Sequence, residues 1–253
     1  MLLPRFPLPS HVSFPPLAPR PSSKRAAVLR SRQQTIDDEA VREDLAYMLA
    51  AEPLAFLAEA ALTATVLGPE IVDLVFDLLD SGHPEAEAVA QALEWLLPGP
   101  MLEPPLGLQL PAWLARLDRT ALTDACRRRD GPDSTTSSYL IEITLADGRI
   151  GTLHARIDHA VNGALTHAFV VDERSDEIRA LLLAGEHLRQ RSFAAPPRPF
   201  RPIKPSTARR ALAGALYGVD EIELPLNLQS PWPGIRPLVS FLVHDLAGTQ
   251  TGP

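Results

Sequence analysis

The chain has 253 residues, of which 45% are hydrophobic and 22% charged, the usage of a globular protein with a sizeable core. Its formal net charge of −7 argues against a general nucleic-acid binder, because phosphate affinity comes from clustered Lys and Arg. A single cysteine, Cys126, excludes an internal disulfide, and no apolar run reaches the roughly 18 residues of a membrane span. Pro4, Pro7 and Pro9 interrupt any signal-peptide core, so we expect a cytoplasmic protein.

The N-terminal segment is basic and rich in proline. Residues 1–36 contain no acid and carry a charge of +6, which leaves −13 for the remainder. Residues 1–34 lack apolar periodicity, and their prolines remove backbone donors and favour an extended conformation. We predict that residues 1–34 are a disordered basic arm, which is either an interaction arm or a solvated tail. Within it, Pro16, Pro19 and Arg20 resemble a PxxP ligand with a basic neighbour.

Residues 35–97 predict a helical region of four short helices. Thr35 can cap the first helix, and Pro53, Pro69 and Pro84 stand in the first turn of the others. Apolar residues recur at helical spacing in all four. The short connections imply that neighbouring helices fold back on one another.

Within this region, the segment PEIVDLVFDLLDSGHPEAEAVAQALEWLL, residues 69–97, resembles a HEAT-type helical hairpin. Ala86-Glu87 stands where the second helix of that repeat often has a Val-Arg pair. A solenoid needs at least three stacked copies of the repeat. The sequence contains one segment that resembles the repeat and, before it, a second segment with a weaker resemblance. An ordinary helical hairpin is the alternative.

Residues 98–111 form a proline-rich connector, which we take as an approximate domain boundary. The sequence does not decide whether the chain forms one domain or two. Residues 112–253 are expected to form an α+β region. Its first part predicts a helix over 111–127 and then a polar loop over 130–138. The inward residues of that helix are expected to be Trp113, Leu114, Leu117 and Leu122.

The clearest strand signal begins a three-stranded antiparallel meander over residues 139–171. Residues 139–145 place Ile141 and Ile143 on one face and Glu142 and Thr144 on the other. Asp147-Gly148 signals a first hairpin, and Asn162-Gly163 a second.

The register of the first hairpin depends on the length of its loop. A two-residue turn would place His154 beside Ile141. A three-residue loop with Gly148 in a bulge instead places Leu153 with the isoleucines and His154 outside. We favour the three-residue loop, because it keeps the apolar residues on one face. Asp158 then faces Thr166, whereas in the other register it faces His167.

Three further helices are expected after the meander. The first begins at Ser175 or Asp176, the second at Ser206, and the last covers about residues 235–246. The predicted fold class is therefore α+β, with an N-terminal helical layer, the three-stranded meander and flanking C-terminal helices. Three strands are too few to fold alone, so helices must cover their apolar face.

Candidate site residues gather on the predicted hairpin. His154, Asp158 and His167 are candidate metal ligands, because imidazole and carboxylate suit divalent transition metals. Asp158, His159 and His167 are candidate acid–base residues. The spacing matches no metal signature, and His159 should point away from Asp158. Structural pairing on the surface is the favoured interpretation, so we expect no metal and no cofactor.

Cys126 precedes Arg127, Arg128 and Arg129, and adjacent cations would lower a thiol pKa. The sequence supplies no recognisable base for such a nucleophile. The chain also lacks a phosphate-binding glycine loop, a GxSxG elbow, an HExxH motif and paired CxxC motifs.

Residues 147–173, DGRIGTLHARIDHAVNGALTHAFVVDE, are similar to a strand–IDH–loop–AF pattern in uncharacterised actinobacterial proteins. This resemblance implies no function. Taken together, the sequence favours a non-catalytic interaction or regulatory protein whose partner is another protein rather than a membrane or a nucleic acid. The alternative is an enzyme, hydrolase-like or metal-dependent, with its site on the His154–His167 hairpin.

The alternation of the first strand gives a prediction. Ile143 should be buried beneath the helix that carries Leu181 and Leu182, so Ile143→Asp should cost several kcal/mol, a large part of a typical ~5–15 kcal/mol. Thr144→Asp, one residue away, should cost about 1 kcal/mol or less. Urea denaturation of both variants measures the difference, and equal losses would contradict the assumed exposed face.

Overall fold

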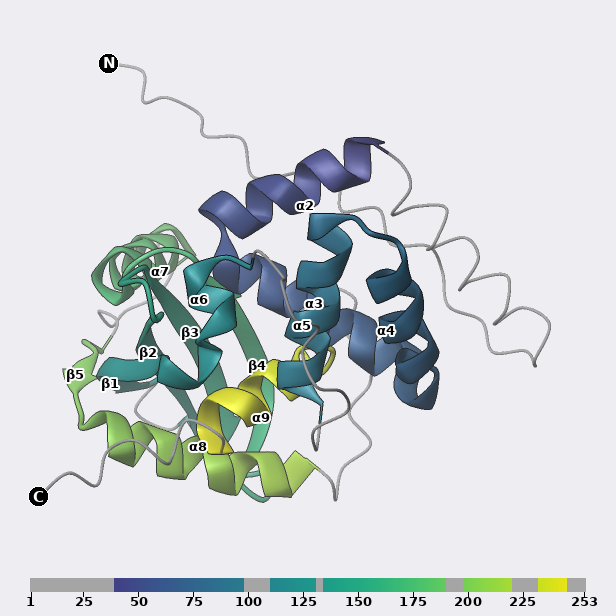
Figure 1. The fold of residues 1–253 in the computed structure, drawn as a ribbon. Helices are drawn as coiled ribbons and strands as arrows, with labels where there is room; N and C mark the ends of the chain where they lie inside the picture. The colour runs from purple at the N-terminus through teal and green to yellow at the C-terminus, as the bar shows by residue number, and fades with distance from the viewer. Residues whose placement is uncertain (1–38, 98–109, 131–133, 190–197, 220–231, 245–253) are drawn as a thin grey trace, which may run out of the picture.

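A computed structural model describes residues 39–97, 110–130, 134–189, 198–219 and 232–244 (Figure 1). The predicted arm, residues 1–34, and nearly all of the connector 98–111 lie outside these ranges. The described chain is an α+β structure that combines helices with one antiparallel sheet. None of its helices is long and apolar enough to cross a membrane.

Four helices occupy the N-terminal part, as their proline and periodicity signals predicted. They are α2 (Glu39–Ala51), α3 (Pro53–Leu67), α4 (Ile71–Asp80) and α5 (Pro84–Leu96), with a 3-10 turn, η1 (Gly68–Glu70), before α4. Helix α3 is apolar around most of its circumference, as expected of a buried helix. It contacts α2, α4, α5 and α9 (Arg236–His244) as well as the sheet, so it is the centre of the helical layer.

The sheet has five strands, not the three that the sequence predicted. Their order is β4-β3-β2-β1-β5, and each neighbouring pair is antiparallel. The strands are β1 (Ala121–Arg129), β2 (Thr136–Thr144), β3 (Ile150–Asp158), β4 (Ala164–Val171) and β5 (Arg201–Pro202). The predicted meander is thus present as β2–β3–β4, and β1 and β5 extend it.

The helix predicted over 111–127 is wrong. Only one turn, α6 (Ala112–Ala115), and the 3-10 turn η2 (Leu117–Arg119) are helical, and β1 follows. Trp113, Leu114 and Leu117 are fully buried, as predicted, but in these two short turns. The rest of the segment pairs with β2 along its whole length. Pairing with β2 decides the structure of β1, because the run of arginines in β1 carries no strand signal of its own.

The first hairpin has the three-residue loop that the sequence favoured. The Leu145 N–H donates to the Arg149 carbonyl over 2.8 Å, and Gly148 adopts φ 88° in the loop between them. Ile141 consequently pairs with Leu153, and Glu142 pairs with Thr152. Ile141, Ile143 and Leu153 therefore share one face of the sheet.

Helices cover both faces of the sheet. Helices α3 and α8 (Pro205–Val219) contact the sheet, and Ile141, Ile143 and Leu153 share one hydrophobic cluster with buried residues of both. Helix α7 (Ser175–Arg189) contacts β2 and β3 and belongs to a second cluster, formed around Leu140 on the opposite face. The expectation that α7 covers Ile143 is therefore wrong, and its Leu181 is 68% exposed. Ile143 itself is fully buried, as predicted.

The corner between α2 and α3 is fastened to the sheet by polar contacts. Asp172, just after β4, accepts hydrogen bonds from the backbone N–H groups of Leu54 (2.9 Å) and Ala55 (3.0 Å) in the first turn of α3. Burial raises the pKa of Asp172 even though both bonds favour its charged form. At the end of α2, Arg149 donates to the Ala50 carbonyl over 2.8 Å. The Trp113 indole N–H donates to the Leu49 carbonyl over 3.2 Å.

The same corner gives a second prediction. A Cβ at Gly151 would lie 2.4 Å from Leu54 Cδ1 and 2.6 Å from the Val171 carbonyl oxygen. Moving that backbone oxygen away would disturb the strand and cost free energy. Gly151→Ala should therefore destabilise the fold by about 1–3 kcal/mol. Gly214, within α8, has no atom within 4 Å of such a Cβ. Gly214→Ala should raise stability by roughly 0.5–1 kcal/mol. Thermal and urea unfolding compare the pair, and a neutral Gly151→Ala would contradict the close packing.

Candidate functional site

The face of the sheet toward α7 is polar and largely buried. The sequence placed Glu142 and His154 outside, and that expectation is wrong because α7 and the segment around Phe200 cover this face. The buried polar residues on this face are Arg128, Ser138, Glu142, Thr152 and His154. They come from β1, β2 and β3, and the candidate site is therefore assembled from three neighbouring strands.

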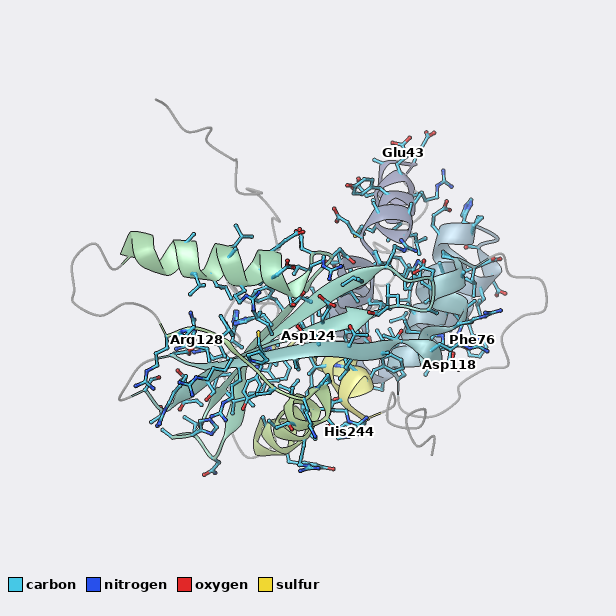
Figure 2. All side chains as sticks on the ribbon, turned by 90° about the vertical axis from the view of Figure 1, so that its left-hand side faces the viewer. Glu43, Phe76, Asp118, Asp124, Arg128 and His244 are labelled. Carbon is cyan, nitrogen blue, oxygen red and sulfur yellow. The ribbon has the colours of Figure 1, made fainter. Side chains whose placement is uncertain are left out.

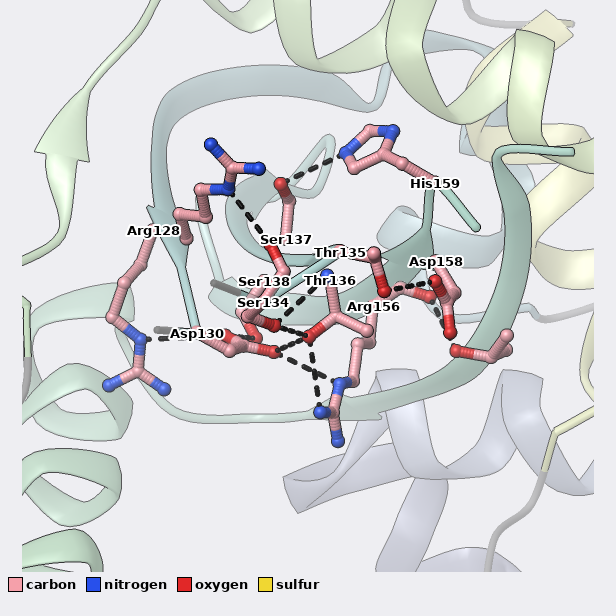
Figure 3. A network of polar contacts seen from close by, with 12 residues as sticks. Arg128, Asp130, Ser134, Thr135, Thr136, Ser137, Ser138, Arg156, Asp158 and His159 are labelled. Carbon is pink, nitrogen blue, oxygen red and sulfur yellow. Dashed lines mark hydrogen bonds and ion pairs between the residues drawn. The ribbon is translucent and has the colours of Figure 1, made fainter. Parts of the chain in front are cut away.

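Asp130 is the centre of a network at the end of β1 (Figure 3). Its carboxylate accepts hydrogen bonds from the hydroxyls of Thr136 and Ser138, both at 2.8 Å. Arg156 Nε lies 3.0 Å from one carboxylate oxygen, and Arg128 Nε lies 3.7 Å from the other. Arg128 also lies over the Phe200 ring, with its guanidinium carbon 4.6 Å from the ring centroid. Two cations and two hydroxyls therefore compensate this carboxylate.

His154 lies beside this network, in the middle of β3. Its ring centroid is 5.7 Å from that of His167 and 4.8 Å from that of Phe169, both on β4. His154 is only 6% exposed, and its Nδ1 has no hydrogen-bond partner within the described residues. Burial, reinforced by the neighbouring His167, lowers the pKa of His154 to about 3. Burial also lowers the pKa of His167. Both rings are thus neutral at physiological pH, and His154 in particular is a weak proton acceptor.

Asp158 and His159 lie apart from these rings. A register shift between Arg156 and Ile157 pairs Asp158 with Ala164, so neither Thr166 nor His167 faces it, contrary to both predicted registers. Asp158 instead accepts a hydrogen bond from the Thr135 hydroxyl (2.8 Å) and one from the Ala160 N–H (2.9 Å). These bonds lower its pKa and fix the turn after β3.

His159 contacts a different strand. Its Nε2 lies 3.0 Å from the Ser137 hydroxyl, to which Arg127 also donates over 3.1 Å. Ser137 is fully buried on the strand and not presented to solvent. A serine–histidine contact of this kind positions the turn against β2, and it leaves the hydroxyl inaccessible to a substrate.

The candidate residues do not converge on a metal site. His154 and His167 are neighbours, but Asp158 and His159 are engaged elsewhere. Among the residues that the structure describes, no three His, Cys, Asp or Glu side chains are placed to hold a metal ion. The other candidate binding residues, Pro16, Pro19 and Arg20, lie outside the described ranges.

Cys126 is buried on β1, between Leu140 of β2 and Pro202 of β5. Burial raises the pKa of its thiol to about 11, against the opposing effect of Arg179. The reactive thiolate that the arginine run suggested is therefore disfavoured at neutral pH. The strand sends successive arginines to opposite faces, so Arg128 is buried whereas Arg127 and Arg129 are exposed.

Sequence reasoning missed the Asp130 network because residues 130–138 were predicted to be a loop. Its members come from the β1–β2 hairpin and from β3, and they become neighbours only when these strands pair. The available signal was the cluster of hydroxyl residues after Asp130, in the segment STTSS.

A second surface, on α4, is apolar and acidic. The opposite side of this helix is buried through Ile71, Leu74, Val75 and Leu78. Val72 is 40% exposed and Phe76 is 48% exposed, one helical turn apart. Asp73, Asp77 and Asp80 are exposed on the same helix. We call these five residues the α4 face. Figure 2 shows Phe76 at the outside of the helical layer.

Comparisons of the chain with protein-family models, with curated proteins and with solved structures find no match.

The burial of His154 gives a pH prediction. Between about pH 3 and 6.5 the unfolded histidine binds a proton that the folded one does not, so stability should fall as the pH drops through this window. One such group contributes up to about 1.4 kcal/mol per pH unit. His154→Leu should therefore flatten the profile of unfolding free energy between pH 6.5 and 4. His244→Leu, at an exposed position, serves as the control. Parallel profiles for wild type and His154→Leu would contradict the buried neutral ring.

Proposed function

We propose that this protein is a non-catalytic interaction or regulatory protein and that it contacts its protein partner through the α4 face. The observation that carries the proposal is the exposure of Val72 and Phe76 on a helix whose other side is already buried. Large apolar side chains grouped on a surface and bordered by charges are typical of protein-binding sites. An aromatic residue at the centre of such a group is the usual anchor of the interaction.

The chemistry of the polar face supports the same proposal. An enzyme on the His154–His167 hairpin needs an accessible group whose pKa is near the working pH. His154 is buried with a pKa of about 3, and the pKa of Cys126 is about 11. Asp130 is bound on both oxygens by residues of the sheet. These groups are suited to holding β1, β2 and β3 together.

The test is affinity purification with the full chain as bait. We expect Val72→Ser combined with Phe76→Ser to lose the proteins that wild type retains, because the variant removes the apolar contact without touching the core. Leu181→Ser is the matched control, since Leu181 is a more exposed apolar residue on α7. Quantitative mass spectrometry compares the three baits.

Two results would contradict the proposal. One is an unchanged set of partners for the α4 variant, with its folding verified by circular dichroism. The other is stoichiometric zinc or iron in the purified protein, which would favour the enzyme alternative and the hairpin candidates. Pro16→Ala with Pro19→Ala tests separately whether the PxxP segment adds a contact of its own.

A further inference from the structure

The α4 face lies in a part of the chain from which positive charge is absent. Between Arg42 and Arg116 the sequence has 12 acidic residues and no Lys or Arg. Three of these acids, Asp73, Asp77 and Asp80, border the exposed Val72 and Phe76. An occupant of this face should therefore combine basic and apolar side chains, because uncompensated carboxylates around an apolar contact repel an acidic partner.

One segment of the same chain has this composition. Residues 24–32, KRAAVLRSR, place Val28 and Leu29 between a pair of cations on one side and two arginines on the other. Residues 1–36 contain no acidic residue at all. The basic part of the chain, residues 1–36, and its longest stretch without positive charge, residues 43–115, are therefore separated by only six residues.

The structure places the start of α2 close to the C-terminal end of α4. Helix α2 begins at Glu39, and its Arg42 Nη1 lies 3.1 Å from His83 Nε2. His83 is in the turn between α4 and α5, three residues after the end of α4 at Asp80. The first turn of α2 therefore lies beside the turn that follows the C-terminal end of α4.

The distances suit a contact within one molecule. Helix α4 has 10 residues and so a length of about 15 Å. The stretch from Arg32 to Glu39 can span up to about 23 Å when extended. Residues 24–32 can thus reach every turn of α4 without any displacement of α2.

We propose that residues 24–32 of the same chain occupy the α4 face, with Val28 and Leu29 on Val72 and Phe76 and the flanking cations on the three aspartates. The inference rests on the proposed function, because it names the resident occupant of the same surface. A tethered segment acts at an effective concentration in the millimolar range, so an external partner must displace it. The protein is then autoinhibited, and a partner with a more basic or more apolar segment relieves the inhibition.

The test is photo-crosslinking of the full chain with p-benzoylphenylalanine in place of Phe76. We expect the main product to be an intramolecular crosslink to residues 24–32, identified by mass spectrometry in the monomer fraction. The same photoreactive residue in place of Leu181 is the control and should not yield this crosslink. High salt should lower the yield, because exposed ion pairs are screened.

A charge exchange makes the test specific. Asp73→Lys with Asp77→Lys should lower the crosslink yield by ~5-fold, the effect of exposed ion pairs of this kind. Adding Lys24→Glu, Arg25→Glu and Arg30→Glu to that variant should restore the yield. Restoration of the crosslink yield requires direct contact between residues 24–32 and α4. A folding defect in either variant would not restore the yield.

Three outcomes would overturn the inference: no crosslink to residues 24–32, crosslinks formed only between two copies of the chain, or no restoration by the charge exchange. In each case the proposed function stands if Val72→Ser with Phe76→Ser still loses its partners. Conversely, an intramolecular crosslink with an unchanged partner set overturns the proposed function alone.

Discussion

The fold depends on the carboxylate of Asp172 at the N-terminus of α3. Helix α3 starts with Pro53 after Glu52, and the Glu52 side chain makes no capping hydrogen bond there. Its first turn would therefore have unsatisfied N–H groups inside the protein, which would cost free energy. Asp172 supplies both acceptors from a position 118 residues away in the sequence from Leu54. Because Arg149 holds the end of α2 in the same way, the central helix and the sheet are positioned as a single unit.

The sequence predicted those parts of the fold whose signals are local. Proline in the first helical turn and apolar periodicity located the N-terminal helices, and Asp147-Gly148 gave the register of the first hairpin. The same kind of helical signal was wrong over residues 111–127, where a strand pairs with β2. Strand β1 was not predicted, because its sequence, ALTDACRRR, has no clear alternation of polar and apolar residues. Pairing with the neighbouring strands stabilises it. The burial of the sheet face beneath α7 was not predicted for a similar reason, since Phe200 and Ile178 contact Leu140 only in the folded chain.

The sequence did not predict the arrangement of the candidate site. It singled out a group of histidines on the second hairpin, and a single register shift next to Arg156 separates Asp158 from His167. Asp130, which binds most of the polar side chains around it, had no motif to mark it. Networks of this type join residues of adjacent strands, and they specify one pairing because a slipped strand would leave their charges buried without partners.

The outermost strand, β5, has consequences for solubility at high concentration. It has two residues, Arg201 and Pro202, and a proline has no backbone N–H to offer a further strand. On the neighbouring strand β1, Arg127 pairs with Arg201 of β5, and Arg129 is exposed past that pairing. Two molecules that joined at this edge would therefore bring like charges together. Short edges with proline and like charges are the features by which β-proteins avoid fibre formation. This edge of the sheet is therefore protected against pairing with a strand of another molecule, although the sheet itself is rich in strand-forming residues.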